Sequence, residues 1–370
     1  MANYGDLHQA TGAGWSVWWR IGAQNGSGLE VWFADYHTRR VLWRGTQPFA
    51  IVPYHVPVPG TEPPAPFFTY KDGLNPKNGG AAFRALNHVA ANSPQWWTDY
   101  SQDAVKDTDA VVVEVEPATD FEPAVLAITA KFQCGWYQYV HRWEFRSDGE
   151  IRPHLGMGGG LNPYAKSKAH VHHMYFRIDL DIDGFSSDVF EVFDHNSYND
   201  PGGDGWKLIT VQGKHIVDTK TARKFRIHDL ASKSAKGELR GYEIELPQSA
   251  PLDSHSTGDA WVTIYRGDTV QQGAEVGVNA SDQELETLYA TGPLNTASGS
   301  DIVLWVVVRH HHEPRDNAEE AEFLPYHYEE FHIVPRGFEV LRIGRERGGR
   351  PPSGRRAATR RRQPHTTHSR

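Results

Sequence analysis

The chain has 370 residues, a formal net charge of −8 and a single cysteine, Cys134. One cysteine excludes an internal disulfide framework, and no apolar run approaches the roughly 18 residues that a membrane-spanning helix needs. The segment 347–370 holds eight arginines and no acid, so residues 1–346 carry −16 (−8 minus +8). Such an acidic body repels nucleic acids and attracts small cations, which leaves nucleic-acid contact only to the basic tail.

Most of the chain reads as strands, because runs rich in Val, Ile and aromatic residues are bounded by Gly, Pro, Asn or Asp. In chain order these runs are residues 28–36, 40–45, 110–116, 124–132, 137–146, 172–182, 207–213, 224–230, 241–247, 260–266 and 301–310. A helix is expected only in short pieces such as 281–290, with Ser281 as the N-cap. Segments 53–66 and 153–163 are rich in Pro and Gly and are expected to be long loops. This pattern predicts an all-β fold with minor helix, a large antiparallel β-sandwich.

The Arg-rich segment 347–370 is of low complexity and is expected to be a disordered tail after a folded domain of residues 1–346. Met1 is not followed by a charged and then apolar leader, which favours a cytoplasmic location.

Three histidines lie within residues 169–184, "AHVHHMYFRIDLDIDG". Side chains two residues apart on a strand share a face, so His170 and His172 point together while His173 points away. Two imidazoles on one face form half of a site for copper, zinc or iron. A third ligand is offered by "HHH" at 310–312, where strand parity does not choose among the three because a proline turn begins nearby.

The same stretch carries aspartates on alternate positions, Asp179, Asp181 and Asp183, followed by Gly184. Their parity is opposite to that of His170, so they are expected on the other face of the strand. Alternating carboxylates suit a hard cation such as calcium. The alternative is a solvated outer face at the edge of a sheet.

These motifs, together with the later "HEPR" at 312–315, resemble the catalytic domain of the copper amine oxidases. The resemblance covers most of residues 15–345 and implies copper held by His170, His172 and His312. It also implies a calcium site made by Asp179, the Leu180 carbonyl, Asp181 and Asp301. The small domains that usually precede this β-sandwich are not seen in the sequence.

The resemblance extends to the segment "CGWYQYVHRWEF" at 134–145, which places Tyr137 at the position of the tyrosine that becomes topaquinone. Trp136 replaces the asparagine and Gln138 replaces the acid of the family motif. Both have parity opposite to that of Tyr137 and are expected to point away from the copper.

Three further roles are implied near the start of the chain, in "IVPY" and "FFTYKDG". Asp72 matches the catalytic base, Tyr70 the gate of the substrate channel, and Tyr54 the tyrosine that hydrogen-bonds the quinone. The alternative for Asp72 is an ordinary turn carboxylate before Gly73.

The implied activity is oxidation of a primary amine by O2 and water to an aldehyde, ammonia and hydrogen peroxide, by a homodimer with no membrane attachment. Two other readings stay open. One is a divergent member that binds copper without forming topaquinone and performs another oxidation or none. The other is a non-catalytic β-sandwich binding protein whose histidines are structural.

Overall fold

A computed structural model describes most of the first 338 residues. The described residues are 6–22, 27–54, 68–86, 107–160, 162, 169–193, 205–217, 224–247, 252, 255–267, 282–313 and 324–338. These residues are almost entirely β-structure, and every strand pairing among them is antiparallel. The expected all-β fold is therefore confirmed. The Arg-rich tail and Ser281 lie outside the described residues.

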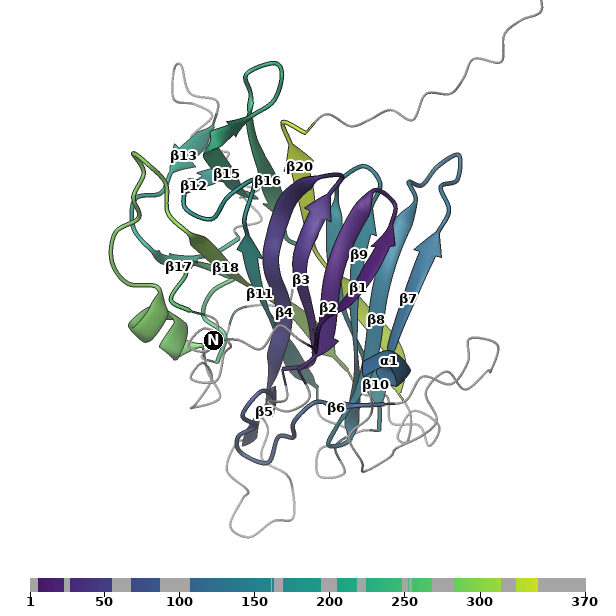
Figure 1. The fold of residues 1–370 in the computed structure, drawn as a ribbon. Coiled ribbons are helices and arrows are strands. Elements are labelled where there is room, and N and C mark those ends of the chain that lie inside the picture. Colours follow the sequence, from purple (N-terminus) through teal and green to yellow (C-terminus); the bar gives the residue numbers. More distant parts are fainter. Residues whose placement is uncertain are drawn as a thin grey trace, which may run out of the picture. The chain divides into compact units, whose positions relative to one another are not determined.

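The first sheet contains the histidine strand. Its order is β1 (His8–Gly12), β2 (Trp15–Ile21), β3 (Leu29–Tyr36), β4 (Arg39–Tyr54), β11 (His170–Leu180), β18 (Ile302–His312), β17 (Ala260–Ile264) and β14 (Gly213–His215), with β5 (Phe68–Gly73) paired to β4 (Figure 1). Strands far apart in sequence thus become neighbours, because β11 lies between β4 and β18.

The second sheet carries the tyrosine segment. Its order is β13 (Trp206–Leu208), β12 (Asp188–Phe193), β15 (Lys224–Lys233), β16 (Leu239–Glu245), β20 (His332–Arg336), β10 (Ile151–Gly159), β9 (Tyr137–Arg146), β8 (Val125–Cys134) and β6 (Arg84–Ala85). Two further strands pair off this path: β19 (Leu324–Glu330) with β10, and β7 (Val111–Glu116) with β8. Within the described residues, the named helices are α1 (Asp107–Ala110) and a short π-helix, η3 (Leu285–Tyr289).

The core lies between the two sheets and follows strand parity. On β11, Met174, Phe176 and Ile178 point into the large apolar cluster that both sheets share. The intervening Tyr175 joins a second cluster on the opposite face of the first sheet, where residues of η3 cover it. Both faces of β11 are thus buried, and each face packs against a different apolar cluster.

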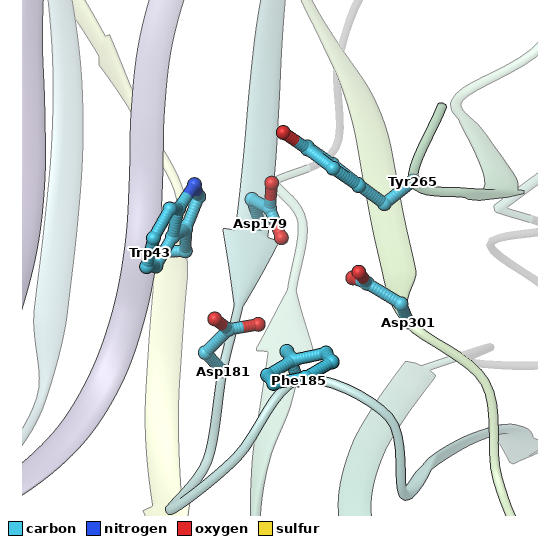
Figure 2. A pocket seen from close by; sticks show the side chains of 6 residues that line it. All are labelled: Trp43, Asp179, Asp181, Phe185, Tyr265 and Asp301. Atoms are coloured by element: carbon cyan, nitrogen blue, oxygen red, sulfur yellow. The ribbon is translucent and has the colours of Figure 1, made fainter. Parts of the chain in front are cut away.

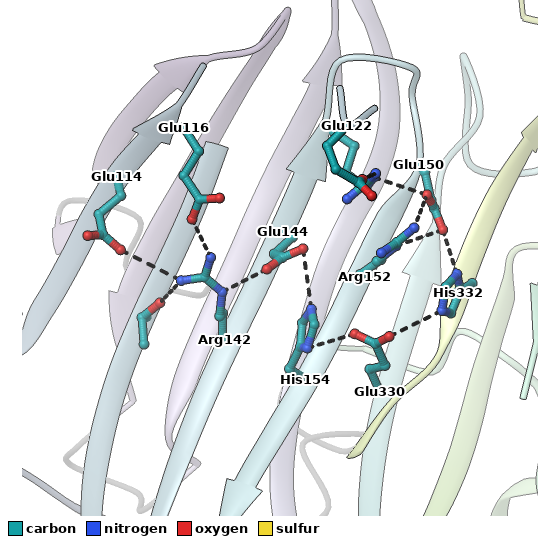
Figure 3. A network of polar contacts seen from close by, with 12 residues as sticks. Glu114, Glu116, Glu122, Arg142, Glu144, Glu150, Arg152, His154, Glu330 and His332 are labelled. Atoms are coloured by element: carbon teal, nitrogen blue, oxygen red, sulfur yellow. Dashed lines mark hydrogen bonds and ion pairs between the residues drawn. The ribbon is translucent and has the colours of Figure 1, made fainter. Parts of the chain in front are cut away.

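The second sheet carries a polar ladder on one face instead (Figure 3). Arg142 bridges Glu116 at 2.7 Å and Glu144 at 2.8 Å, and His154 lies between Glu144 and Glu330. The two carboxylates raise the pKa of His154 against the effect of its burial, which favours the charged imidazolium. Opposite charges on neighbouring strands stabilise a sheet face that is not packed against apolar residues.

Three predicted elements need correction. Residues 153–159, the first part of the loop expected at 153–163, belong to β10. Pro153 fits in this strand because it lies opposite the break between β19 and β20, where no ladder bond is required. The single strand expected at 207–213 is two short strands, β13 and β14, in different sheets. The helix expected at 281–290 is mainly the five-residue η3. Among the described residues, no helix is long and apolar enough to cross a membrane.

Candidate functional site

The third histidine is chosen by strand register. In the β11–β18 pair, His170 lies directly opposite His312, and His172 lies opposite His310. Residues directly opposite in an antiparallel pair present their side chains on the same face. Strand β18 continues through His312, so parity does extend that far, and it leaves His310 and His312 as candidates. The side chain of His310 bonds Glu329 at 2.6 Å, whereas His312 turns to His170.

His170, His172 and His312 form a compact buried group. The Nε2 atoms of His170 and His172 are 3.0 Å apart, and Nδ1 of His312 is 3.2 Å from Nε2 of His170. One ring nitrogen from each of the three lies within 4.8 Å of the others. Burial, followed by the neighbouring imidazoles, lowers the pKa of His172 well below its usual value. A neutral imidazole is the form that ligates metals, so three converging nitrogens fit copper, zinc or iron.

Tyr137 reaches this group from the opposite sheet. Its hydroxyl lies 3.1 Å from Nε2 of His170 and 2.5 Å from the hydroxyl of Tyr54, at the end of β4. The Tyr137 ring also meets His172 edge-on, with ring centroids 4.9 Å apart. Burial raises the pKa of Tyr137 well above its ordinary value, so the phenol is neutral unless a cation beside it offsets that effect.

Asp72 lies in the same cavity as Tyr137 and is buried. Its position on β5, opposite Ala50 of β4, turns the carboxyl into the space between the sheets, so the reading of an ordinary turn carboxylate is wrong. One oxygen accepts the hydroxyl of Tyr139 at 2.9 Å, and the other accepts the backbone N–H of Ala81 at 3.1 Å. Burial raises the pKa of Asp72 to about 6. A carboxyl with such a pKa exchanges protons near neutral pH.

Tyr139 is a contact that sequence reasoning did not assign. It is fully buried on β9, two residues after Tyr137, so both tyrosines face the interior. Tyr139 thereby links the Asp72 carboxyl to the tyrosine strand. The Tyr-x-Tyr spacing was a usable signal for this, because it places both rings on one face.

The two departures from the family motif are placed differently. The side chain of Gln138 turns away, with its amide nitrogen 3.0 Å from the Gln133 side-chain oxygen, as parity predicts. The expectation that Trp136 also points away is wrong, because Trp136 lines the cavity and its ring lies 5.9 Å from that of Tyr70. Trp136 belongs to the two-residue turn between β8 and β9, where strand parity does not apply.

A second group of acids lies on the other face of β11, as its parity predicts. Asp179, Asp181 and Asp301 offer oxygens within 4.8 Å of one another. Figure 2 shows them around one space, beside the rings of Trp43, Phe185 and Tyr265. These six residues line a hollow of about 330 Å³.

Carboxylates this close disfavour one another's charge. Burial, followed by Asp179 and Asp301, raises the pKa of Asp181 to about 8. Asp188 is also fully buried, and both of its oxygens lack a hydrogen-bond partner. Its pKa is raised well above the usual range, by burial and by neighbours that include Asp181 and Asp301. The buried Arg177 guanidinium bonds Asp179 at 3.1 Å, and a bound cation would offset the charge of the remaining carboxylates when they ionise.

Comparison with known proteins fits this geometry. The profile of the copper amine oxidase enzyme domain matches residues 116–341, which is more than half of the chain. The chain belongs to the copper amine oxidase family. The match contains Tyr137 and the three histidines, while Tyr54, Tyr70 and Asp72 precede it.

A curated family member is the peroxisomal copper-containing amine oxidase alpha 2 of Arabidopsis thaliana. It is 22% identical over 319 residues, which are 74% of this chain and 46% of that protein. The chain therefore spans about half the length of the curated relative.

Solved family members share the fold. A copper-containing benzylamine oxidase from Hansenula polymorpha superposes with a TM-score of 0.67 at 20% identity, over 90% of this chain and 61% of that one. The lysyl oxidase of Pichia pastoris gives a TM-score of 0.60 at 14% identity, over 88% and 51%. An amine oxidase of Aspergillus nidulans gives 0.59 at 16% identity, over 88% and 52%.

Proposed function

We propose that this chain is a copper-dependent primary-amine oxidase that converts Tyr137 into topaquinone. The observation that carries the proposal is the position of the Tyr137 hydroxyl, 3.1 Å from His170 within the three-histidine group. The cavity that Tyr137 lines also holds the Asp72 carboxyl, whose pKa of about 6 suits proton transfer. The proposed metal centre thus lies in the same buried region as the cofactor precursor and the base.

Each residue has a role that follows from its contacts. His170, His172 and His312 hold the copper, and copper with the quinone supplies the redox chemistry with O2. Tyr54 donates or accepts the 2.5 Å hydrogen bond that orients Tyr137. Asp72 takes a proton from the carbon next to the amine nitrogen, while the Tyr139 hydroxyl and the Ala81 N–H hold its carboxylate in place. Tyr70 lies at the cavity as the gate.

The proposal is tested by the mass of the peptide that contains Tyr137. After copper is added to the metal-free protein in air, we expect this peptide to gain two oxygen atoms and lose two hydrogen atoms. The reason is that the Tyr137 ring, which lies beside the proposed copper site, is the ring that is oxidised. Zinc added in place of copper leaves the mass unchanged, and so does Tyr137→Phe with copper. A Tyr137 peptide of unchanged mass with copper and air would remove the amine-oxidase proposal.

The second candidate is a family member that binds copper without forming topaquinone. Trp136 and Gln138 favour it, since both flank Tyr137 where the family motif has other residues. It predicts full copper binding together with an unchanged Tyr137 peptide. The non-catalytic binding protein predicts an unchanged Tyr137 peptide without stoichiometric copper binding.

For the acidic group we propose a calcium ion held by Asp179, the Leu180 carbonyl, Asp181 and Asp301. Terbium is a suitable probe, because Trp43 and Tyr265 line the same hollow and can sensitise its luminescence. We expect Asp181→Asn to weaken terbium binding by at least about tenfold, since it removes a buried ligand charge. The affinity should also rise with pH toward the Asp181 pKa of about 8, because the ion displaces a proton.

Asp183→Asn is the matched control for this experiment. Its carboxylate is the third of the alternating series, but it bonds Arg39 at 2.7 Å and the Ser232 hydroxyl at 2.5 Å instead of lining the hollow. Equal loss of luminescence in both variants would contradict the assignment, and displacement of terbium by calcium completes the test.

A small primary amine and O2 are the substrates, and the assembly is a homodimer, to be tested by light scattering.

A further inference from the structure

The cavity beside Tyr137 is small. Its volume is about 10 Å³, roughly the space that one water molecule needs. Its lining residues are Val52, Tyr54, Tyr70, Asp72, Gly79, Cys134, Gly135, Trp136 and Tyr137. A substrate carbon that reaches both Tyr137 and Asp72 must fit here, so the walls decide which amines enter.

One wall is Tyr70, and its ring is confined on several sides. Tyr54 meets it edge-on at a centroid distance of 5.6 Å, and Trp136 meets it edge-on at 5.9 Å. At Gly79, which has φ of +89°, even a Cβ atom would come within 3.0 Å of Cε1 of Tyr70. Tyr70 is partly exposed, so while Tyr54, Trp136 and Gly79 keep their positions its ring can move only toward solvent.

Trp136 is itself held by the backbone. It occupies the turn that joins Cys134 to Tyr137, where Gly135 has φ of +59°. The Trp136 carbonyl accepts the N–H of Gly160 at 2.9 Å. A Cβ atom added at Gly159 would lie 3.0 Å from the same carbonyl oxygen, so β10 packs closely against the turn. These contacts hold the backbone of Trp136, from which the indole projects.

We propose that Trp136 is a specificity-determining residue that, by bracing Tyr70, favours an amine as small as methylamine over amines that carry a ring next to the CH2–NH2 group. The inference rests on the proposed amine-oxidase function and concerns the same cavity. An amine with a bulky ring next to its CH2–NH2 group must displace Tyr70 and Trp136 together. Since a single misfitting methylene already changes discrimination by about 10- to 200-fold, a whole ring is expected to cost at least as much.

The test compares methylamine with benzylamine in the copper-loaded full chain. We expect kcat/KM for methylamine to exceed that for benzylamine by at least about 100-fold in the parent enzyme. Trp136→Ala and Trp136→Asn are expected to reduce that ratio by at least about tenfold, chiefly by raising kcat/KM for benzylamine. Methylhydrazine and phenylhydrazine provide a readout without turnover, because both trap a quinone. Phenylhydrazine is expected to react slowly with the parent and fast with the variants, and methylhydrazine fast with all.

Gln138→Ala is the matched control, since Gln138 also departs from the family motif but turns toward Gln133. It is expected to keep the parental ratio. The Tyr137 peptide mass is measured in every sample. An unchanged mass in the parent removes the proposed function and this inference with it. If the quinone forms but the parent uses both amines equally well, this inference alone is overturned. The same holds if the quinone forms and Trp136→Ala leaves the ratio of kcat/KM for methylamine to that for benzylamine unchanged. A variant that fails to form quinone is replaced by Trp136→Phe, for which an intermediate ratio is expected.

Discussion

His172→Ala is expected to abolish stoichiometric copper binding, whereas His173→Ala retains one copper per chain. The Nε2 atom of His172 lies 3.0 Å from that of His170 in the buried group, so its loss leaves two of the three proposed ligands. His173 is equally buried but has the parity of Tyr175, on the opposite face of β11. Even residues that only support metal ligands cost about 10- to 100-fold in affinity when removed, so a lost ligand is expected to cost more. Metal analysis after dialysis against a defined copper buffer measures the effect.

The two histidines form a matched pair because both side chains are completely buried. Thermal unfolding without metal therefore separates a packing defect, which both variants share, from a ligand defect. Copper is expected to raise the unfolding temperature of His173→Ala and not that of His172→Ala, because only a folded state that binds the ion is stabilised by it. Equal copper loss in both variants would contradict the assignment by strand parity.

The separation of the two groups on β11 could be predicted from periodicity alone. Alternation along residues 170–181 separates the histidines from the aspartates, and the described structure places the two groups on opposite faces of β11. The repeat of two residues holds here because β11 is paired on both sides, with β4 and with β18, so it cannot slip without exposing its core face.

Pairing across the chain could not be predicted in the same way. The sequence offers three consecutive histidines at 310–312, and only the register of β18 against β11 sets His312 opposite His170. The closeness of Asp72 to Tyr137 likewise depends on β5 returning along β4 and on the packing of two sheets. Local patterns carry no information about register between strands that are more than a hundred residues apart.

Strand alternation gave a wrong side-chain direction where the chain leaves the strand. Trp136 lies in a two-residue turn, and its indole lines the cavity although alternation predicts the reverse. The loop prediction was wrong for residues 153–159, because Pro153 and the glycines indicate a loop, while the pairing of β10 with β9 and β19 imposes a strand. In both cases tertiary context overrode a local signal.

Asp72→Asn is expected to lower kcat for the proposed amine oxidation by about 10²- to 10⁴-fold while copper binding and the Tyr137 peptide mass stay as in the parent, because only the proposed proton acceptor is lost. The parent's kcat/KM is expected to fall on the acid side of about pH 6. Burial raises the Asp72 pKa to that value, and the protonated carboxyl below it accepts no proton. This acid limb should be absent from the residual activity of the variant.

The same substitution is expected to stabilise the fold. A carboxyl whose pKa is raised from 3.8 to about 6 on folding favours the folded state below its unfolded pKa and opposes it above the folded pKa, where both states are ionised. Asparagine carries no charge, so at pH 8 Asp72→Asn is expected to gain about 1–3 kcal/mol in unfolding free energy, and less at pH 4.5. The amide oxygen can still accept the Ala81 N–H. Denaturant titrations at both pH values measure the unfolding free energy. If Asp72→Asn is less stable than the parent at pH 8, the Asp72 carboxylate stabilises the fold and this prediction is wrong.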